Sequence, residues 1–80
     1  MLTADNILEY LRDELQVKTD GVDSGTLLFS SGVIDSFGLV QIIAYVEERC
    51  RIRFAADDVN LENLDSIERI LSLVERSAGR

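Results

Sequence analysis

The sequence predicts an all-α fold, a small four-helix bundle with three main helices, one short helix and a long first loop. Apolar residues recur at helical spacing in three stretches, and no stretch sustains the alternation typical of a strand. The chain contains 5 glycines and no proline, so glycines and polar clusters separate the elements. A chain of 80 residues buries only about 60% of its unfolded surface, which supports one core. We therefore expect a single domain over residues 1–80.

The first helix is expected over residues 4–17. Thr3 and Asp5 are the two candidates for its N-cap, since both side chains can accept a hydrogen bond from an amide of the first turn. Polar and charged side chains occupy the opposite face, as in an ordinary amphipathic helix. The expected core stripe consists of Ile7, Leu8, Leu11 and Leu15.

Residues 18–35 form the long connection of the predicted bundle. A loop of this length without regular structure is unusual in a compact domain, so we expect its apolar triplet at 27–29 to hold it over the core. The segment DGVDSG is not expected to bind calcium, because Val22 stands where the calcium motif needs a ligand oxygen.

The second main helix is expected to begin at Ser36 and to end near Arg49. Its apolar residues lie on one stripe that faces the core, namely Leu39, Ile42, Ile43, Val46 and Cys50. Cys50 is the only cysteine, so the chain cannot form an internal disulfide or a zinc site built on several thiolates. At the end of an apolar stripe, it is expected to serve as a small core residue.

The remainder of the chain predicts a short extended connection, a brief helical turn and a last helix. Residues 51–54 alternate arginine with apolar side chains, and residues 55–64 offer room for one helical turn. Asp65 and Glu68, three residues apart, are expected to form the capping box of the last helix. The apolar stripe of that helix is Ile67, Ile70, Leu71 and Val74.

The charge balance bears on partners and location. Fifteen acidic residues against eight basic ones leave a net charge of −7, which disfavours nucleic acid and anionic lipid surfaces as partners. Partners with basic surfaces are favoured, although the same charge equally serves to keep a small protein soluble. The N-terminal segment lacks the apolar run of a secretory signal, and no stretch is long enough to span a membrane. A cytoplasmic monomer is expected.

Ser36 stands at the mouth of a helix, where a reactive hydroxyl would suit an enzyme. Gly38 follows it as in the nucleophile elbow of serine hydrolases, but Ile34 occupies the position of the other glycine of that motif. The chain has no histidine to accept the serine proton, so the hydroxyl has no base of its own. We therefore expect no catalytic residues and no enzymatic activity.

The same serine is well placed to carry an anion. With Asp35 as N-cap, Ser36 is the first helical residue and lies beside the unpaired amides and the positive end of the helix dipole. A phosphate ester there would be stabilised by roughly 0.3 to 1 kcal/mol. The alternative is that Asp35 and Ser36 are only a favourable helix start.

The segment GVIDSFG, followed by an amphipathic helix, resembles the 4'-phosphopantetheine attachment motif of acyl carrier proteins. The likeness extends over most of the chain and includes the first helix, the long loop and the short helix before the last one. It implies that a phosphopantetheinyl transferase joins Ser36 to 4'-phosphopantetheine taken from coenzyme A. Asp35 matches the acid that caps the helix and takes part in recognition by the transferase. The resemblance implies a carrier that catalyses nothing.

The residues after Ser36 depart from the commonest form of this motif. Phe37 and Gly38 give the sequence DSFG, which resembles carriers for D-alanine and stand-alone carriers of amino acids. This form implies an aminoacyl group held as a thioester, loaded by an adenylating ligase and passed to a downstream acyl-accepting enzyme. A fatty-acid or polyketide acyl carrier protein is the alternative. Gly38 costs the helix up to about 1 kcal/mol relative to alanine, and close approach by a partner, close approach by the arm and simple tolerance are all open explanations.

A second set of residues is a candidate docking surface for partner proteins. It lies off the core stripe of the second helix and consists of Phe37, Gln41, Tyr45 and Glu48, with Gly38 beside them. Half-burial of the two aromatic rings against the loop is the competing interpretation. The same surface also suits a second alternative function, an acidic helical adaptor that binds a basic partner without any prosthetic group.

Overall fold

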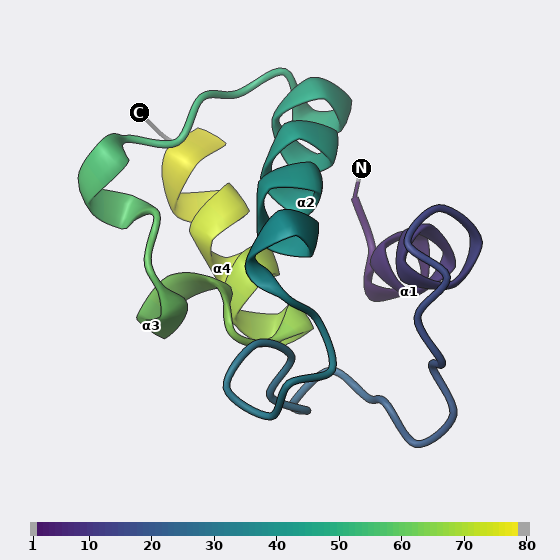
Figure 1. Ribbon diagram of the computed structural model, residues 1–80. Coiled ribbons are helices and arrows are strands. Elements are labelled where there is room, and N and C mark those ends of the chain that lie inside the picture. The colour runs from purple at the N-terminus through teal and green to yellow at the C-terminus, as the bar shows by residue number, and fades with distance from the viewer. Residues whose placement is uncertain (1, 79–80) are drawn as a thin grey trace.

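The protein is described by a computed structural model that covers residues 2–78. Within that range all regular secondary structure is helical, which confirms the predicted four-helix bundle with three main helices and one short one. The elements are α1 (Ala4–Asp13), α2 (Ser36–Cys50), the 3-10 turn η1 (Ala56–Asp58), α3 (Leu61–Leu64) and α4 (Ile67–Ala78). Figure 1 shows α2 in front of α4, with α1 on one side of the pair and α3 on the other.

Helix α1 begins where the sequence predicts and ends earlier. Thr3 is the N-cap: its hydroxyl accepts from the Asn6 amide at 3.2 Å, and the Asn6 side chain accepts from the Thr3 amide at 3.0 Å. The predicted extension to residue 17 is wrong, because Gln16 adopts a left-handed φ of 55° that a right-handed helix cannot accommodate. The chain turns away there, and the Val17 amide donates to the Leu11 carbonyl at 2.8 Å.

Helix α2 begins at Ser36 as predicted. The side chain of Asp35 accepts a hydrogen bond from the Gly38 amide, which makes Asp35 the N-cap. At the other end Arg51 takes a left-handed conformation, and the Ile52 amide returns to the Glu47 carbonyl at 3.1 Å. Many helices end with a glycine in the left-handed conformation, and in α2 an arginine occupies that position.

The core receives side chains from the four helices and from the loop. Its fully buried members are Ile7, Leu11, Leu28, Ile42, Val46, Leu64, Ile67, Ile70 and Leu73. Leu28 is the middle residue of the apolar triplet, so the expectation that the triplet holds the loop over the core is confirmed. Its neighbour Leu27 is exposed and Phe29 is half-buried.

The predicted capping box of the last helix is wrong. The hydroxyl of Ser66, rather than the carboxylate of Asp65, accepts a hydrogen bond from the first turn, given by the Arg69 amide at 3.2 Å. Asp65 is turned inward, where its carboxylate accepts from the Phe29 amide at 2.8 Å and from the Ser30 amide at 3.0 Å. Amides that lose contact with water on folding need acceptors, and a carboxylate satisfies several of them at once.

The connection before α3 contains more helix than the single turn expected. Residues 55–64 form both η1 and α3, separated by Val59 and Asn60. Asn60 starts α3 by accepting from the Asn63 amide at 2.9 Å. An N-cap here interrupts one helical turn and begins another, because the capping residue itself is not helical.

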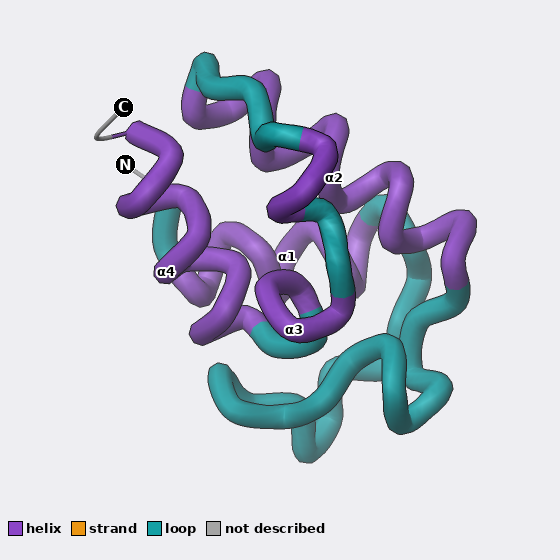
Figure 2. The backbone as a smooth tube through the Cα atoms, turned by 90° about the vertical axis from the view of Figure 1, so that its left-hand side faces the viewer, coloured by secondary structure: helices purple, strands orange, loops and turns teal. Residues whose placement is uncertain are grey.

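The loop from residue 14 to residue 35 covers one end of the bundle, as the teal tube in Figure 2 shows. Backbone hydrogen bonds tie it to the corner between α3 and α4: the Leu28 amide donates to the Asp65 carbonyl at 2.7 Å, and the Glu68 amide donates to the Ser24 carbonyl at 3.0 Å. The loop is therefore attached to the bundle just before it leads into α2.

Candidate functional site

Ser36 is the first residue of α2 and is exposed to solvent. The preceding Asp35 accepts from the Gly38 amide at 2.9 Å, so the cap is made by the aspartate and the serine hydroxyl is not needed for it. The amides of the first turn lack carbonyl partners within the helix. An accessible hydroxyl at a positively polarised helix end is suited to carry an anionic substituent.

Gly38 is buried, in contrast to Ser36 two residues before it. A Cβ atom at Gly38 would lie 2.3 Å from the Cγ2 atom of Ile34, which is closer than two carbon atoms can approach. The loop residue Ile34 is itself 4% exposed and belongs to the core. The close packing of the loop against α2 therefore explains why position 38 is a glycine.

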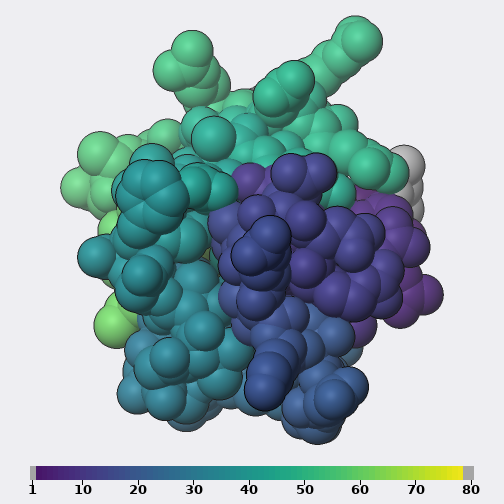
Figure 3. Space-filling view, turned by 45° about the vertical axis from the view of Figure 1, so that its right-hand side comes forward, coloured from purple at the N-terminus to yellow at the C-terminus, as the bar shows by residue number. Residues whose placement is uncertain are grey.

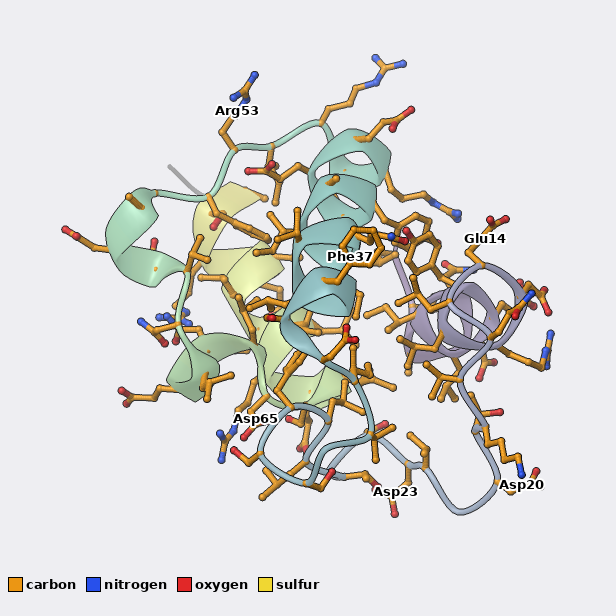
Figure 4. The ribbon with its side chains drawn as sticks, in the orientation of Figure 1. Glu14, Asp20, Asp23, Phe37, Arg53 and Asp65 are labelled. Atoms are coloured by element: carbon orange, nitrogen blue, oxygen red, sulfur yellow. The ribbon has the colours of Figure 1, made fainter. Side chains whose placement is uncertain are left out.

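Phe37 has an exposed fraction of 70%, which is unusual for a large apolar side chain. Figure 4 shows its ring in front of α2. Val40, one turn later, is 65% exposed and extends the same apolar surface. Val40 is not among the predicted site residues, although its spacing of three from Phe37 places it on the same helical face.

Tyr45 lies against α1 instead of pointing freely into solvent. Its ring stacks on that of Tyr10 with centroids 4.1 Å apart and an angle of 17° between the planes. The Tyr10 hydroxyl donates to the Gln41 carbonyl at 3.3 Å. Of the predicted docking residues, Phe37 and Glu48 are therefore exposed, while Gln41 and Tyr45 are half-buried at the contact with α1.

An open groove of about 600 Å³ lies between the exit of α1 and the start of α2. Figure 3 shows the indigo surface of the segment after α1 beside the teal surface of the start of α2. Residues 14–18 line one side of the groove, and residues 33–35, Phe37, Gly38 and Gln41 line the other. The structure thus brings four of the predicted site residues to one groove directly beside Ser36.

The comparison with protein families identifies the family of the chain. A family model described as a phosphopantetheine attachment site matches residues 5–74. The chain belongs to this phosphopantetheine-binding family. The protein is also similar to a probable acyl carrier protein, PigG, from a Serratia strain (ATCC 39006), with 23% identity over 62 residues that cover 78% of this chain and 71% of the relative.

Membership in the phosphopantetheine-binding family establishes the resemblance to acyl carrier proteins and makes the protein a carrier rather than a catalyst. Its prosthetic group is 4'-phosphopantetheine, and it works with a phosphopantetheinyl transferase and with partner enzymes. The match favours the carrier over an adaptor that lacks a prosthetic group. The described residues fit the group, since an exposed serine begins a 15-residue helix whose first turn favours a phosphodiester.

The carrier has one further thiol, that of Cys50. This side chain is half-buried at the end of α2 and packs against the core, as the sequence predicts. Burial raises the pKa of the Cys50 thiol, so it is a weaker nucleophile at neutral pH than an exposed thiol. It is therefore unsuited to hold the cargo in place of the prosthetic group.

Two other kinds of site are not found between residues 2 and 78. No group of three or more histidine, cysteine, aspartate or glutamate side chains in this range could hold a metal ion. Likewise, no helix among these residues has both the length and the apolar character to cross a membrane.

Proposed function

We propose that Ser36 carries the 4'-phosphopantetheine arm and that the carrier holds an aminoacyl group loaded by an adenylating ligase. The observation that supports the position most directly is the exposed Ser36 hydroxyl at the start of α2, immediately after the Asp35 cap. Members of the family carry 4'-phosphopantetheine as their prosthetic group, and its terminal thiol holds an acyl group as a thioester.

The division of roles at the helix start follows from the hydrogen bonds. Asp35 satisfies the Gly38 amide and so holds the first turn in place. In the transfer step the Ser36 oxygen attacks the phosphopantetheinyl phosphorus of coenzyme A, its proton passes to the transferase, and adenosine bisphosphate leaves. The external base is required because the chain has no histidine. Asp35 also presents an exposed carboxylate that the transferase can recognise.

The aminoacyl cargo is inferred from the DSFG form of the motif, with Phe37 and Gly38 after the serine. Fatty-acyl and polyketide groups are the competing cargo classes. The loaded group would then be passed to a downstream acyl-accepting enzyme. We also propose that the carrier is a cytoplasmic monomer, and its net charge of −7, which makes copies of the chain repel one another, supports the monomeric state.

We propose the exposed face of α2 as the surface that partner enzymes bind. Phe37 is its apolar centre, Val40 extends it, and Glu48 supplies negative charge at the far end of the helix. Gly38, Gln41 and Tyr45 support this face from within, through their packing against Ile34 and against α1.

Intact-protein mass spectrometry tests the attachment site. Incubation with coenzyme A and a broad-range transferase is expected to add the mass of one phosphopantetheinyl group to the wild type and none to Ser36→Ala. Ser72→Ala is the matched control, because Ser72 is an exposed serine of α4, outside the segment that leads into Ser36, and its loss should leave modification intact. An unmodified wild type, or a modified Ser36→Ala, would contradict the proposal.

The cargo is tested by loading. The modified carrier is mixed with ATP, candidate adenylating ligases and their acids, and the mass of the loaded protein is measured. An increase that corresponds to one amino acid is expected. Loading by fatty-acyl ligases alone would replace the aminoacyl assignment and leave the attachment at Ser36 standing.

A further inference from the structure

Asp65 is a buried carboxylate at the corner between α3 and α4. It is 3% exposed, and its side chain accepts from the Phe29 amide at 2.8 Å, the Ser30 amide at 3.0 Å and the Ser30 hydroxyl. Its own carbonyl accepts from the Leu28 amide at 2.7 Å. Four donors of one loop segment thus converge on a single residue, and Figure 4 places Asp65 where this loop meets the bundle.

Further contacts lead from this segment to Ser36. The Leu28 carbonyl accepts from the Ile34 amide at 2.9 Å. Ile34 packs so closely on Gly38 that a Cβ there would lie 2.3 Å from its Cγ2 atom, and Asp35 accepts from the Gly38 amide at 2.9 Å. Direct contacts therefore link Leu28 through Ile34 to the start of α2.

We propose that Asp65 is a positioning residue for the modification of Ser36: through residues 28–34 it holds Asp35 and Ser36 in the conformation that the transferase recognises. This inference rests on the proposed attachment at Ser36. It gives Asp65 a role separate from helix capping, which Ser66 performs. The charge that faces the Asp65 carboxylate from α4 is that of Arg69, which favours the ionised form.

The physical need for such a residue comes from the length of the loop. Residues 14–35 contain no helix, and conformational entropy opposes any single arrangement of so many residues. Hydrogen bonds to a charged acceptor are stronger than those between neutral groups, and a buried carboxylate can accept several. When the carboxylate is replaced by an amide, one acceptor oxygen is lost where the Ser30 hydroxyl donates. The loop is then free to populate other conformations.

Steady-state transfer from coenzyme A, with the apo-carrier as the varied substrate, tests this role. Asp65→Asn is expected to raise KM for the carrier roughly tenfold while kcat stays nearly constant. A tenfold rise corresponds to a variant in which about one molecule in ten has the conformation that the transferase binds. Ser30→Ala removes one of the four donors, so it should also raise KM, but by less than Asp65→Asn. If Asp65→Asn does not fold, the test is made with Ser30→Ala.

The matched control is Asp23→Asn. Asp23 is an exposed aspartate of the same loop that accepts from the Gly25 amide at 2.9 Å and from the Thr26 hydroxyl at 3.0 Å. Neither of those two contacts reaches residues 28–34. Its substitution should therefore leave KM unchanged, whereas an equal rise in both variants would overturn a specific role for Asp65.

Amide hydrogen exchange separates positioning from a general loss of stability. In Asp65→Asn the amides of Ile34 and Gly38 should lose protection, while those of Ile70 and Leu73 in α4 keep theirs. Equal acceleration of all four amides, or an unchanged KM in a folded variant, would show the inference to be wrong. A wild type that takes no arm at Ser36 would overturn the proposed attachment, and this inference with it.

Discussion

Ser36 and Gly38 lie two residues apart at the start of α2 and meet opposite requirements. Ser36 is exposed, and its hydroxyl is left available because Asp35 makes the cap. Gly38 is buried under Ile34, and its lack of a side chain is what allows the loop to lie so close to the helix. One turn of helix thus combines an accessible hydroxyl with a tightly packed backbone.

Gly38→Ala is expected to lower the free energy of unfolding by about 1 to 3 kcal/mol, the usual effect of overpacking a core. Alanine is the better helix former, so helix propensity alone would give the opposite sign. Urea unfolding followed by circular dichroism measures the change. Gly25→Ala is the control, because a Cβ there has its nearest neighbour at 3.6 Å, an ordinary contact. Equal stability of the two variants would contradict the role assigned to Ile34.

At the scale of the elements, each long helix is bounded by interactions that are local in the chain. Thr3 and Asn6 form the capping box of α1, and Asp35 caps α2. Helix α2 ends at its C-cap Arg51, which is left-handed, and a second left-handed residue, Gln16, follows the end of α1 by three positions. Both are side chains for which this conformation is unfavourable, so the end of α2 and the turn that follows α1 carry backbone strain.

Arg51→Gly is expected to raise the free energy of unfolding by about 0.5 to 1 kcal/mol, because glycine adopts the left-handed region without a steric penalty. Arg53→Gly is the control, since Arg53 lies outside the helices and has no left-handed φ. There glycine only makes the unfolded chain more flexible, so stability should fall slightly. Urea unfolding of the two variants shows opposite signs if the strain at Arg51 is real.

At the scale of the whole molecule, the long loop is a structural part of the bundle. Leu28 enters the core, and the Asp65 carboxylate accepts hydrogen bonds from the Phe29 amide, the Ser30 amide and the Ser30 hydroxyl. The described part of the chain has a radius of gyration of 11.5 Å, close to the value of about 12 Å expected for a compact chain of this length. The loop therefore does not enlarge the molecule beyond the size of a compact chain.

Acid should loosen this junction. The hydrogen bond from the Ser30 hydroxyl is the main reason that the pKa of the Asp65 carboxyl lies below its ordinary value of 3.8. A carboxyl with a lowered pKa in the folded state stabilises the fold above its unfolded pKa, and this contribution is lost as the pH falls through the folded pKa. The difference in unfolding free energy between wild type and Asp65→Asn should therefore be constant above about pH 5 and shrink below pH 4. Urea unfolding between pH 7 and pH 3 measures it, and a pH-independent difference would contradict this account.

The fold class, the start of α2 at Ser36 and the Asp35 cap could be predicted from the sequence. These features depend on apolar spacing within one helix or on hydrogen bonds between residues three apart. Such interactions involve only residues that are close in the sequence. The same holds for the buried stripe of α2, whose Ile42 and Val46 enter the core as expected.

The tertiary structure alone decided the partners of Asp65, Gly38 and Tyr45. Asp65 matched a local capping pattern, yet its carboxylate accepts from the amides of Phe29 and Ser30, which lie far from it in the sequence. Tyr45 matched an exposed helical face, yet its ring stacks on Tyr10 of another helix. A side chain with two possible partners takes the one that satisfies buried groups, and which groups are buried is known only once the helices have packed.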